Sequence, residues 1–388
     1  MPQKRPNGGG SITKRKDGRY HGRAYVLTPD GTRKRVSVYG RTWEETDAKL
    51  AELIRNTRRG VPTPTGSLRF GDYLDYWLEH VVKGQLRPST YASYEPCVRL
   101  HIKPALGSKR LSQLTPAEVR TFLQAKVKEV DEHGRRRLSA RTVQYLHAIL
   151  RAALQHAVRE ELVARNVARL VQPPRVPHEE VRPLDDDEIR AFLAAGRTDR
   201  LYAAYLLMIG LGLRRGEVLG LRWTDVDLDA RVVRVRRTLQ RVNGEILFSE
   251  PKTPRSRRTV PLPRTCVAAL RWHRLRQQAE CASAGRSWDP GGLVFATRAG
   301  RPVEPRNFNR SVYAVCDRAG IRRIRVHDLR HTCASLLLAR GVDARTIMDT
   351  LGHSAISLTL NIYAHVMPAA HRAAAEAMDA ALRRGRQL

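Results

Sequence analysis

The chain has 388 residues, enough for two or three domains with sizeable cores, and it carries a formal net charge of +32 with a pI of about 11.0. A charge of this size repels basic partners and attracts polyanions, so nucleic acid is the first candidate partner, ahead of a merely soluble or ribosome-associated basic protein. The sequence has no apolar run of 18 or more residues, so no transmembrane helix is expected, and its N-terminus does not read as a secretory signal. None of its five cysteines forms a C-x-x-C pair, which argues against a disulfide framework or a zinc ribbon and fits a reducing cytoplasm.

A small basic module is predicted over residues 10–60. Its strand-like segments alternate apolar and polar residues, and the segment after them has the apolar spacing of a helix. The predicted elements are strands at 20–26 and 34–39, an edge strand at 10–13, a turn at Pro29-Asp30-Gly31 and a helix at 42–58. About fifty residues form only a marginal core, so we expect this module to need DNA or its neighbours for full order.

An all-helical domain is predicted over residues 68–172, after a linker rich in Gly, Pro and Thr. Apolar residues recur there at helical spacing in four segments, at 70–80, 89–101, 115–130 and 139–160. Ser89, Thr115 and Ser139 are the expected N-caps. The proline-rich stretch 172–183 is predicted to be a second linker.

The largest unit is predicted over residues 184–388, with helices and one small sheet. A helix opens at Leu184, where acidic residues suit the positive end of the helix dipole, and 201–213 form a buried helix. We expect strands at 231–239, 246–252 and 257–262, with a turn at Val242-Asn243-Gly244, to form a three-stranded meander before helices resume. The expected fold class is therefore a multidomain protein, mainly α with small β-sheets.

Two arginines of this last unit have the chemistry that phosphoryl transfer needs. Arg214 ends the buried apolar segment, and Arg330 lies three residues after His327, on the same face of a helix. Exchange of a phosphodiester spreads charge over non-bridging oxygens, and two fixed guanidiniums can stabilise that charge. Taken alone, either arginine could equally be a solvated surface charge.

Lys252 is more telling than any single arginine. From residue 129 to the C-terminus there are 44 arginines but only this one lysine. A lysine near a phosphate can act as a general acid, whereas an arginine keeps its proton. We therefore expect Lys252 to be functional rather than a leftover of composition.

The order of these motifs resembles the catalytic domain of the tyrosine recombinases, the phage-type integrases. The motifs are Arg214-x-Gly-Glu, Lys252-Thr on a hairpin, His327-x-x-Arg330, Leu-Gly-His353 and a late Tyr363. The resemblance is close over residues 184–366. Residues 68–172 resemble the family's helical core-binding (SAM-like) domain, and residues 1–60 its sheet-plus-helix arm-binding module, by length and pattern only.

The resemblance implies a role for each matched residue. Tyr363 attacks the scissile phosphorus and forms a 3′-phosphotyrosyl link, while His327 takes or returns its proton. Arg214 and Arg330 hold the phosphate, His353 adds a hydrogen bond, and Lys252 protonates the leaving 5′-oxygen. Glu217 is expected to orient Arg214 rather than to react.

The resemblance also implies how the protein assembles. Recombination needs four cleavages, so a homotetramer on two DNA duplexes is expected, with the alanine-rich tail 368–384 docking on a neighbouring subunit. The covalent link conserves the phosphodiester energy, so neither a cofactor nor a metal is expected. The attachment sites are the DNA partner, and an accessory excision or DNA-bending factor can take part.

Two other functions compete with recombination. His327-Asp-Leu-Arg-His331 is close to the zinc-hydrolase motif H-E-x-x-H, with His353 as a third ligand, although Asp replaces the usual Glu. The basic N-terminal module and the helical domain would also suit a DNA-binding regulator without catalysis. Neither alternative accounts for Lys252 and Tyr363 together.

Overall fold

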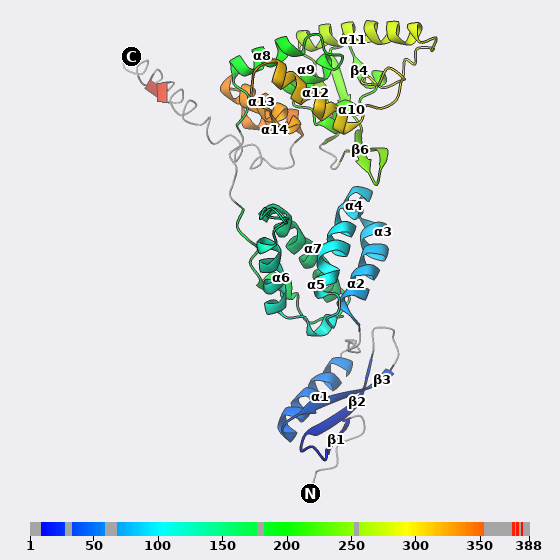
Figure 1. Cartoon of the computed structure of the whole chain (residues 1–388), viewed down its shortest axis with the longest axis vertical. Helices are drawn as coiled ribbons and strands as arrows, with labels where there is room; N and C mark the ends of the chain where they lie inside the picture. The colour runs from blue at the N-terminus through cyan, green and yellow to red at the C-terminus, as the bar shows by residue number, and fades with distance from the viewer. Residues whose placement is uncertain are drawn as a thin grey trace. The chain divides into compact units, whose positions relative to one another are not determined.

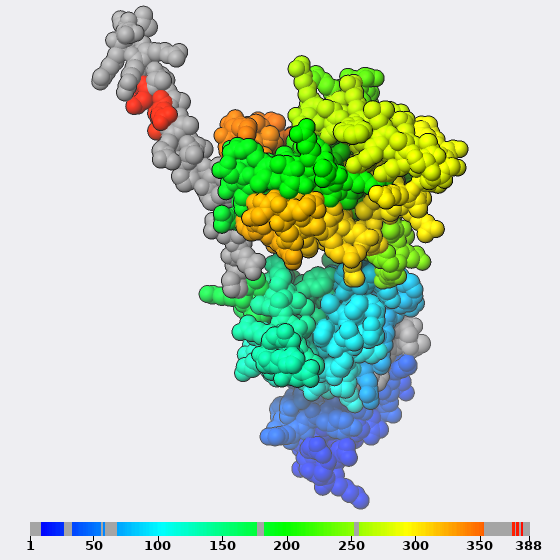
Figure 2. Space-filling model, turned by 45° about the horizontal axis from the view of Figure 1, so that its top comes forward, coloured from blue at the N-terminus to red at the C-terminus, as the bar shows by residue number. Residues whose placement is uncertain are grey.

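A computed structural model describes residues 9–27, 33–58, 68–176, 182–251 and 256–352, together with 375, 376, 378, 379 and 382. The chain divides into two compact units, 1–178 and 179–388, and Figure 1 shows their elements. The structure is mostly helical with small antiparallel sheets, which confirms the predicted fold class. Figure 2 shows one face of these parts as a space-filling surface.

A three-stranded antiparallel sheet and one helix form the N-terminal part. They are β1 (Ser11–Lys14), β2 (Tyr20–Leu27), β3 (Arg33–Gly40) and α1 (Trp43–Arg58), in sheet order β1-β2-β3. Alternate residues of β2, Ala24 and Val26, are buried together with Leu50 of α1. The predicted strands and helix are thus confirmed, while the predicted turn at 29–31 lies outside the described residues.

The named elements of the second part of unit 1 are all helical. Its longer elements are α2 (Phe70–Tyr76), η1 (Trp77–Val82), α4 (Pro88–Cys97), η2 (Val98–Ile102), α6 (Pro116–Lys128) and α7 (Ala140–Arg159), and its shorter ones are α3 (Lys83–Gln85), α5 (Lys103–Leu106), η3 (Leu111–Gln113) and η4 (Val167–Leu170). The segments η1 and η2 are π-helical turns. Pro96 lies just before η2, where the missing N–H of a proline disturbs regular α-helical bonding.

The predicted N-caps of this helical part are right in two cases out of three. The Thr115 hydroxyl accepts a bond from the backbone N–H of Glu118 at 3.3 Å, and the Ser139 hydroxyl accepts one from Thr142 at 3.1 Å. Ser89 is wrong as a cap, because the helix begins one residue earlier with Pro88 in its first turn and Arg87 as the N-cap.

Unit 2 contains seven helices among the described residues. They are α8 (Asp186–Gly196), α9 (Tyr202–Leu211), α10 (Arg215–Leu219), α11 (Arg264–Ser283), α12 (Pro305–Arg318), α13 (Val326–Ala339) and α14 (Ala344–Leu351), with a short 3-10 turn, η5 (Trp223–Asp225). Six of them pack around one core, and Ile347 and Leu351 of the seventh, α14, pack with Cys333 and Ala334 in a smaller cluster. Asp185 caps α8, as the acidic opening predicts. The apolar helix α9 is buried on almost every side, and Phe192 and Phe308 pack in the same core.

The strands of unit 2 differ from the predicted meander. The segment predicted as one strand at 231–239 is two, β5 (Val232–Val235) and β6 (Thr238–Val242). β5 pairs with β4 (Val226–Asp227) and β8 (Arg258–Pro261), whereas β6 pairs only with β7 (Glu245–Ser249). The turn at Asn243 and Gly244 is confirmed, since both have positive φ, and it closes a separate two-stranded hairpin.

No helix among the described residues is both long enough and apolar enough to cross a membrane.

Candidate active site

Arg214 is placed by the sharp end of the buried helix α9. Gly212 stops the helix with a left-handed φ of 63°, and a side chain there would meet Leu351, whose Cδ2 lies 2.1 Å from the position of a Cβ. Arg214 follows as the N-cap of α10. Its backbone N–H donates to Glu217 Oε2 at 2.9 Å and its Nη1 donates to Glu217 Oε1 at 2.8 Å. The motif thus folds into a short, rigid turn that fixes the guanidinium.

Arg330 comes from the buried face of α13 and is one of the largest fully buried side chains, with 1% of its surface exposed. Its Nη1 donates to the carbonyl oxygen of Gly212 at 2.6 Å, and its Nη2 donates to that of Leu351 at 2.8 Å. Among the described residues it forms no ion pair of its own. Burial, and then the nearby charge of Arg214, lower its pKa to about 9. The site therefore holds a buried positive charge that is only partly compensated.

Three guanidiniums meet at the C-terminal end of α14. Arg258 Nε donates to the carbonyl of Thr350 at 2.7 Å, Arg330 Nη2 to that of Leu351, and Arg214 Nη2 to that of Gly352 at 3.1 Å. The last carbonyls of a helix lack intrahelical donors and carry the negative end of its dipole, so they are natural acceptors for cations. Three successive carbonyls thus gather three arginines that are far apart in sequence.

Arg258 is a site residue that the sequence prediction did not include. From β8 it donates to both carboxylate oxygens of Glu217, at 3.2 and 3.0 Å, and both side chains are almost completely buried. Burial raises the pKa of Glu217, but Arg258 and then Arg214 outweigh it and leave that pKa below its ordinary value. No local signal in the sequence pointed to Arg258, because its role depends on where the end of α14 lies in the fold.

His327 stands in the first turn of α13, three residues before Arg330. Its ring lies against that of His331 in a T-shaped arrangement, with centroids 4.8 Å apart. The residue as a whole keeps an exposed surface. Loss of hydration, followed by the charges of His331, Arg330 and Arg214, lowers its pKa to about 4. At neutral pH the imidazole is therefore uncharged and able to accept a proton.

The structure thus brings together Arg214, His327 and Arg330 of the six predicted residues. Lys252, His353 and Tyr363 lie outside the described residues. In sequence, Lys252 lies three residues after Ser249, the last residue of β7, and His353 follows Gly352, whose carbonyl binds Arg214. In the described part of the chain, no three His, Cys, Asp or Glu side chains lie close enough together to hold a metal ion.

The model of the phage integrase family matches residues 182–369, and that of the phage integrase N-terminal SAM-like domain matches residues 69–127. A XerC-like tyrosine recombinase of Caldanaerobacter subterraneus subsp. tengcongensis is 32% identical over 364 residues, which cover 89% of this chain and 91% of the relative. An integrase of Saccharopolyspora erythraea is 26% identical over 438 residues, covering 98% of both chains.

Solved structures share the same fold at lower identity. The Tn1549 transposon integrase in complex with transposon right end DNA has a TM-score of 0.67 at 22% identity, over 80% of this chain and 99% of that one. A lambda integrase tetramer bound to a Holliday junction has a TM-score of 0.54 at 16% identity, over 92% and 96% of the two chains.

Proposed function

Because this chain belongs to the phage integrase family of tyrosine recombinases, we propose that it cuts and rejoins DNA through a covalent bond between Tyr363 and a DNA phosphate. The chain is a site-specific DNA recombinase, an enzyme of strand exchange rather than a zinc hydrolase or a regulator without catalysis.

The uncompensated positive charge of the arginine cluster is the observation that supports a phosphate site. Arg214 and Arg258 bind a single carboxylate, that of Glu217, while Arg330 donates to the carbonyl of Gly212, so the cluster keeps an excess of positive charge. Arg330 is bonded only to carbonyl oxygens among its described neighbours, although it is buried. A phosphodiester that acquires charge in the transition state compensates such a cluster, and fixed guanidiniums lose little reorganisation energy when they bind it.

The remaining roles follow from the chemistry of each group. Tyr363 attacks the phosphorus, with uncharged His327 as the acceptor of its proton, and the 3′-phosphotyrosyl link forms as the 5′-oxygen leaves. Lys252 supplies the proton for that 5′-oxygen, and His353 donates a hydrogen bond to the phosphate. Arg258 and Glu217 are positioning residues, since they act through Arg214 and through the end of α14.

We extend the proposal to the domains and the assembly. Residues 1–60 are the arm-binding module, 68–172 the core-binding domain and 184–388 the catalytic domain. On the sheet face opposite α1, Arg23 lies across from Ser37 and Tyr25 from Arg35, which gives a basic and aromatic surface suited to DNA. The protein acts in the cytoplasm as a homotetramer on attachment-site DNA, with an accessory excision or DNA-bending factor.

The test uses the DNA that flanks the gene. A tRNA-like repeat found there by sequencing supplies the attachment site, which is prepared as a duplex with a nick near the cleavage position. The wild-type protein is expected to give a covalent protein–DNA band on a denaturing gel, and Tyr363→Phe to give none. A protein that binds this duplex but never becomes attached would be a regulator, and the proposal would fail.

A further inference from the structure

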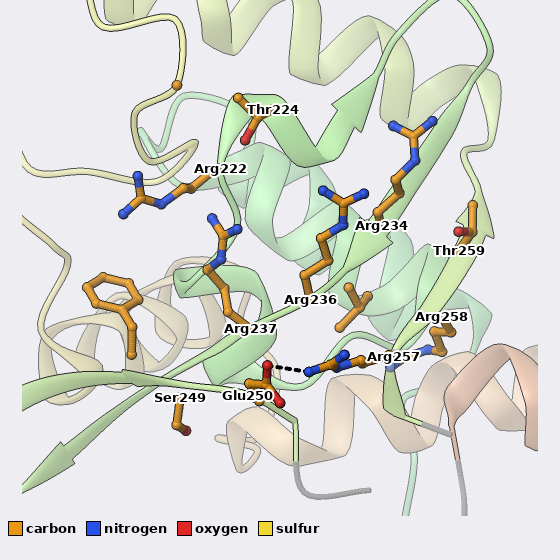
Figure 3. A pocket seen from close by; sticks show the side chains of 13 residues that line it. Arg222, Thr224, Arg234, Arg236, Arg237, Ser249, Glu250, Arg257, Arg258 and Thr259 are labelled. Atoms are coloured by element: carbon orange, nitrogen blue, oxygen red, sulfur yellow. Dashed lines mark ion pairs between the residues drawn. The ribbon is translucent and has the colours of Figure 1, made fainter. Parts of the chain in front are cut away.

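A broad basic groove lies on the sheet of unit 2, beside the arginine cluster. It has a volume of about 1090 Å³ and is open to solvent. Figure 3 shows the side chains that line it, which come mainly from β5, from the turn into β6 and from β7 and β8. Six of them are arginines: Arg222, Arg234, Arg236, Arg237, Arg257 and Arg258.

The arginines form a row rather than a single binding point. Arg234, Arg236 and Arg237 project from one continuous stretch of chain into the groove (Figure 3). Because they follow one another along the chain, their positive charges are spread along the groove rather than gathered at one point. Such a row fits a partner with several negative charges at regular intervals.

The charge of the row is only partly neutralised. Arg257 pairs with Glu250 at the groove wall, and Arg258 with the buried Glu217. The contact of Arg234 with Asp227 is long, at 3.9 Å, and the exposed Arg222 forms no side-chain ion pair among the described residues. A polyanion in the groove would therefore meet guanidinium groups that still have donors to offer.

Asp225 lies beneath this row and holds it in place. The carboxylate is 1% exposed, accepts a hydrogen bond from the backbone N–H of Arg222 at 3.3 Å, and lies 3.3 Å from Arg237 Nη1 and 3.8 Å from Arg236 Nη1. Within the described part of the chain, Asp225 Oδ1 and Arg237 Nη1 have no hydrogen-bond partner. One buried acid thus draws two guanidiniums together without saturating them.

The groove is continuous with the candidate active site. Arg258 lines the groove and also binds Glu217 and the end of α14, and Glu250 of the groove wall lies two residues before Lys252. We propose that the groove binds the sugar-phosphate backbone of the DNA next to the scissile phosphate, through Arg222, Arg234 and Arg236. This rests on the proposed function and adds the surface that holds the neighbouring phosphates.

The experiment measures how DNA binding depends on salt. Each phosphate contact makes the plot of log K, the logarithm of the DNA-binding constant, against log[salt] steeper by about 0.9. The double variant Arg234→Gln/Arg236→Gln is compared with Arg190→Gln/Arg271→Gln, which removes two exposed arginines that are also paired with acids but lie on α8 and α11. All are made in the Tyr363→Phe background, so that binding is read without cleavage.

Binding to two 30-base-pair duplexes of unrelated sequence is followed by fluorescence anisotropy between 50 and 300 mM KCl. The groove variant is expected to make this slope shallower by about 2. It is also expected to bind roughly 60-fold more weakly near 0.1 M salt, equally on both duplexes. The control variant is expected to keep the slope. If the groove variant does not fold, judged by circular dichroism, the exposed Arg222→Gln is expected to lower the slope by about 1.

Two results would overturn the inference. One is a slope that is the same in the groove and control variants, and the other is a loss of binding confined to one duplex, since that would indicate base reading. Covalent attachment by the protein with Tyr363 intact is scored separately. Attachment together with an unchanged slope rejects the groove alone, whereas no attachment rejects the proposed function.

Discussion

Arg258 offers the sharpest test of how the active site is held together. Arg258→Met removes the two bonds to Glu217 and the bond to the Thr350 carbonyl, while its apolar chain keeps most of the volume. Loss of one partner from a buried ion pair costs about 3–5 kcal/mol, and we expect about 3 kcal/mol here because Arg214 still binds Glu217.

The effect on cleavage should exceed the effect on binding. Arg258 fixes the end of α14, whose next carbonyls hold Arg330 and Arg214. A displacement of catalytic groups by about 1 Å can reduce the rate by about 100-fold, and we expect a decrease of that order in single-turnover cleavage at saturating DNA. Arg258→Lys should recover part of the rate, since an ammonium can bind one of the acceptors but not all of them.

A matched variant separates stability from positioning. Arg200 makes a similar fork to Glu280 and also binds the carbonyl of Ala296, on a part of unit 2 where none of the candidate site residues lies. Arg200→Met should lower the stability of unit 2 but leave the cleavage rate unchanged at a temperature where the protein stays folded. Stability is read from hydrogen exchange of α13 peptides under increasing urea.

The reasoning about Arg258 would be refuted by either of two results. One is a folded Arg258→Met protein that cleaves at the wild-type rate. The other is an equal loss of rate in Arg200→Met, which would mean that any weakened ion pair in this unit slows the reaction.

Three further predictions concern the same site. Gly212→Ala should lower the free energy of unfolding by about 2–5 kcal/mol, because left-handed backbone strain adds to the clash with Leu351. Gly341→Ala, which is also at positive φ but has open space around it, should lower it by only about 1–2 kcal/mol. Urea-dependent hydrogen exchange compares the two variants, and equal decreases in stability would show that the clash is relieved. The His327 ring should titrate well below pH 6.5 when followed by NMR, because its pKa in the folded protein is lowered. The unfolded chain then binds more protons than the folded chain between about pH 4 and 6.5, so the stability of the wild type relative to His327→Gln should rise with pH across that window. An NMR titration midpoint at or above pH 6.5 would contradict this prediction. Cleavage should proceed unchanged in EDTA, because guanidiniums stabilise the phosphate charge; a loss restored by zinc would favour the metal-binding alternative at His327 and His331.

Elements governed by local chemistry were predictable from sequence. The caps at Thr115 and Ser139 depend on a hydroxyl and an N–H three residues apart, and the tight turn depends on Asn243 and Gly244 alone. The cap at Ser89 failed because the neighbouring Pro88 suits the first helical turn and moves the start of the helix. The caps, the turn and the start of the helix depend on the types of neighbouring residues alone.

Features that depend on distant contacts were not predictable. The pairing of β5 with β8, across the whole β6–β7 hairpin, is decided by which strands bury Val233 and Val260 together. The sequence motifs identified Arg214 and Arg330 but gave no reason to add Arg258. Its role depends on where the last turn of α14 lies, and nothing local to β8 reveals that.

The identity of the nucleophile is the central claim, and one measurement tests it directly. The covalent complex is digested with nuclease and trypsin, and the peptides are weighed by mass spectrometry. Residues 346–372 form one tryptic peptide in which Tyr363 is the only tyrosine. The account predicts a nucleotide attached to this peptide, with fragment ions that place it on Tyr363. A nucleotide on any other residue, or an unmodified peptide from a complex that does form, would contradict it.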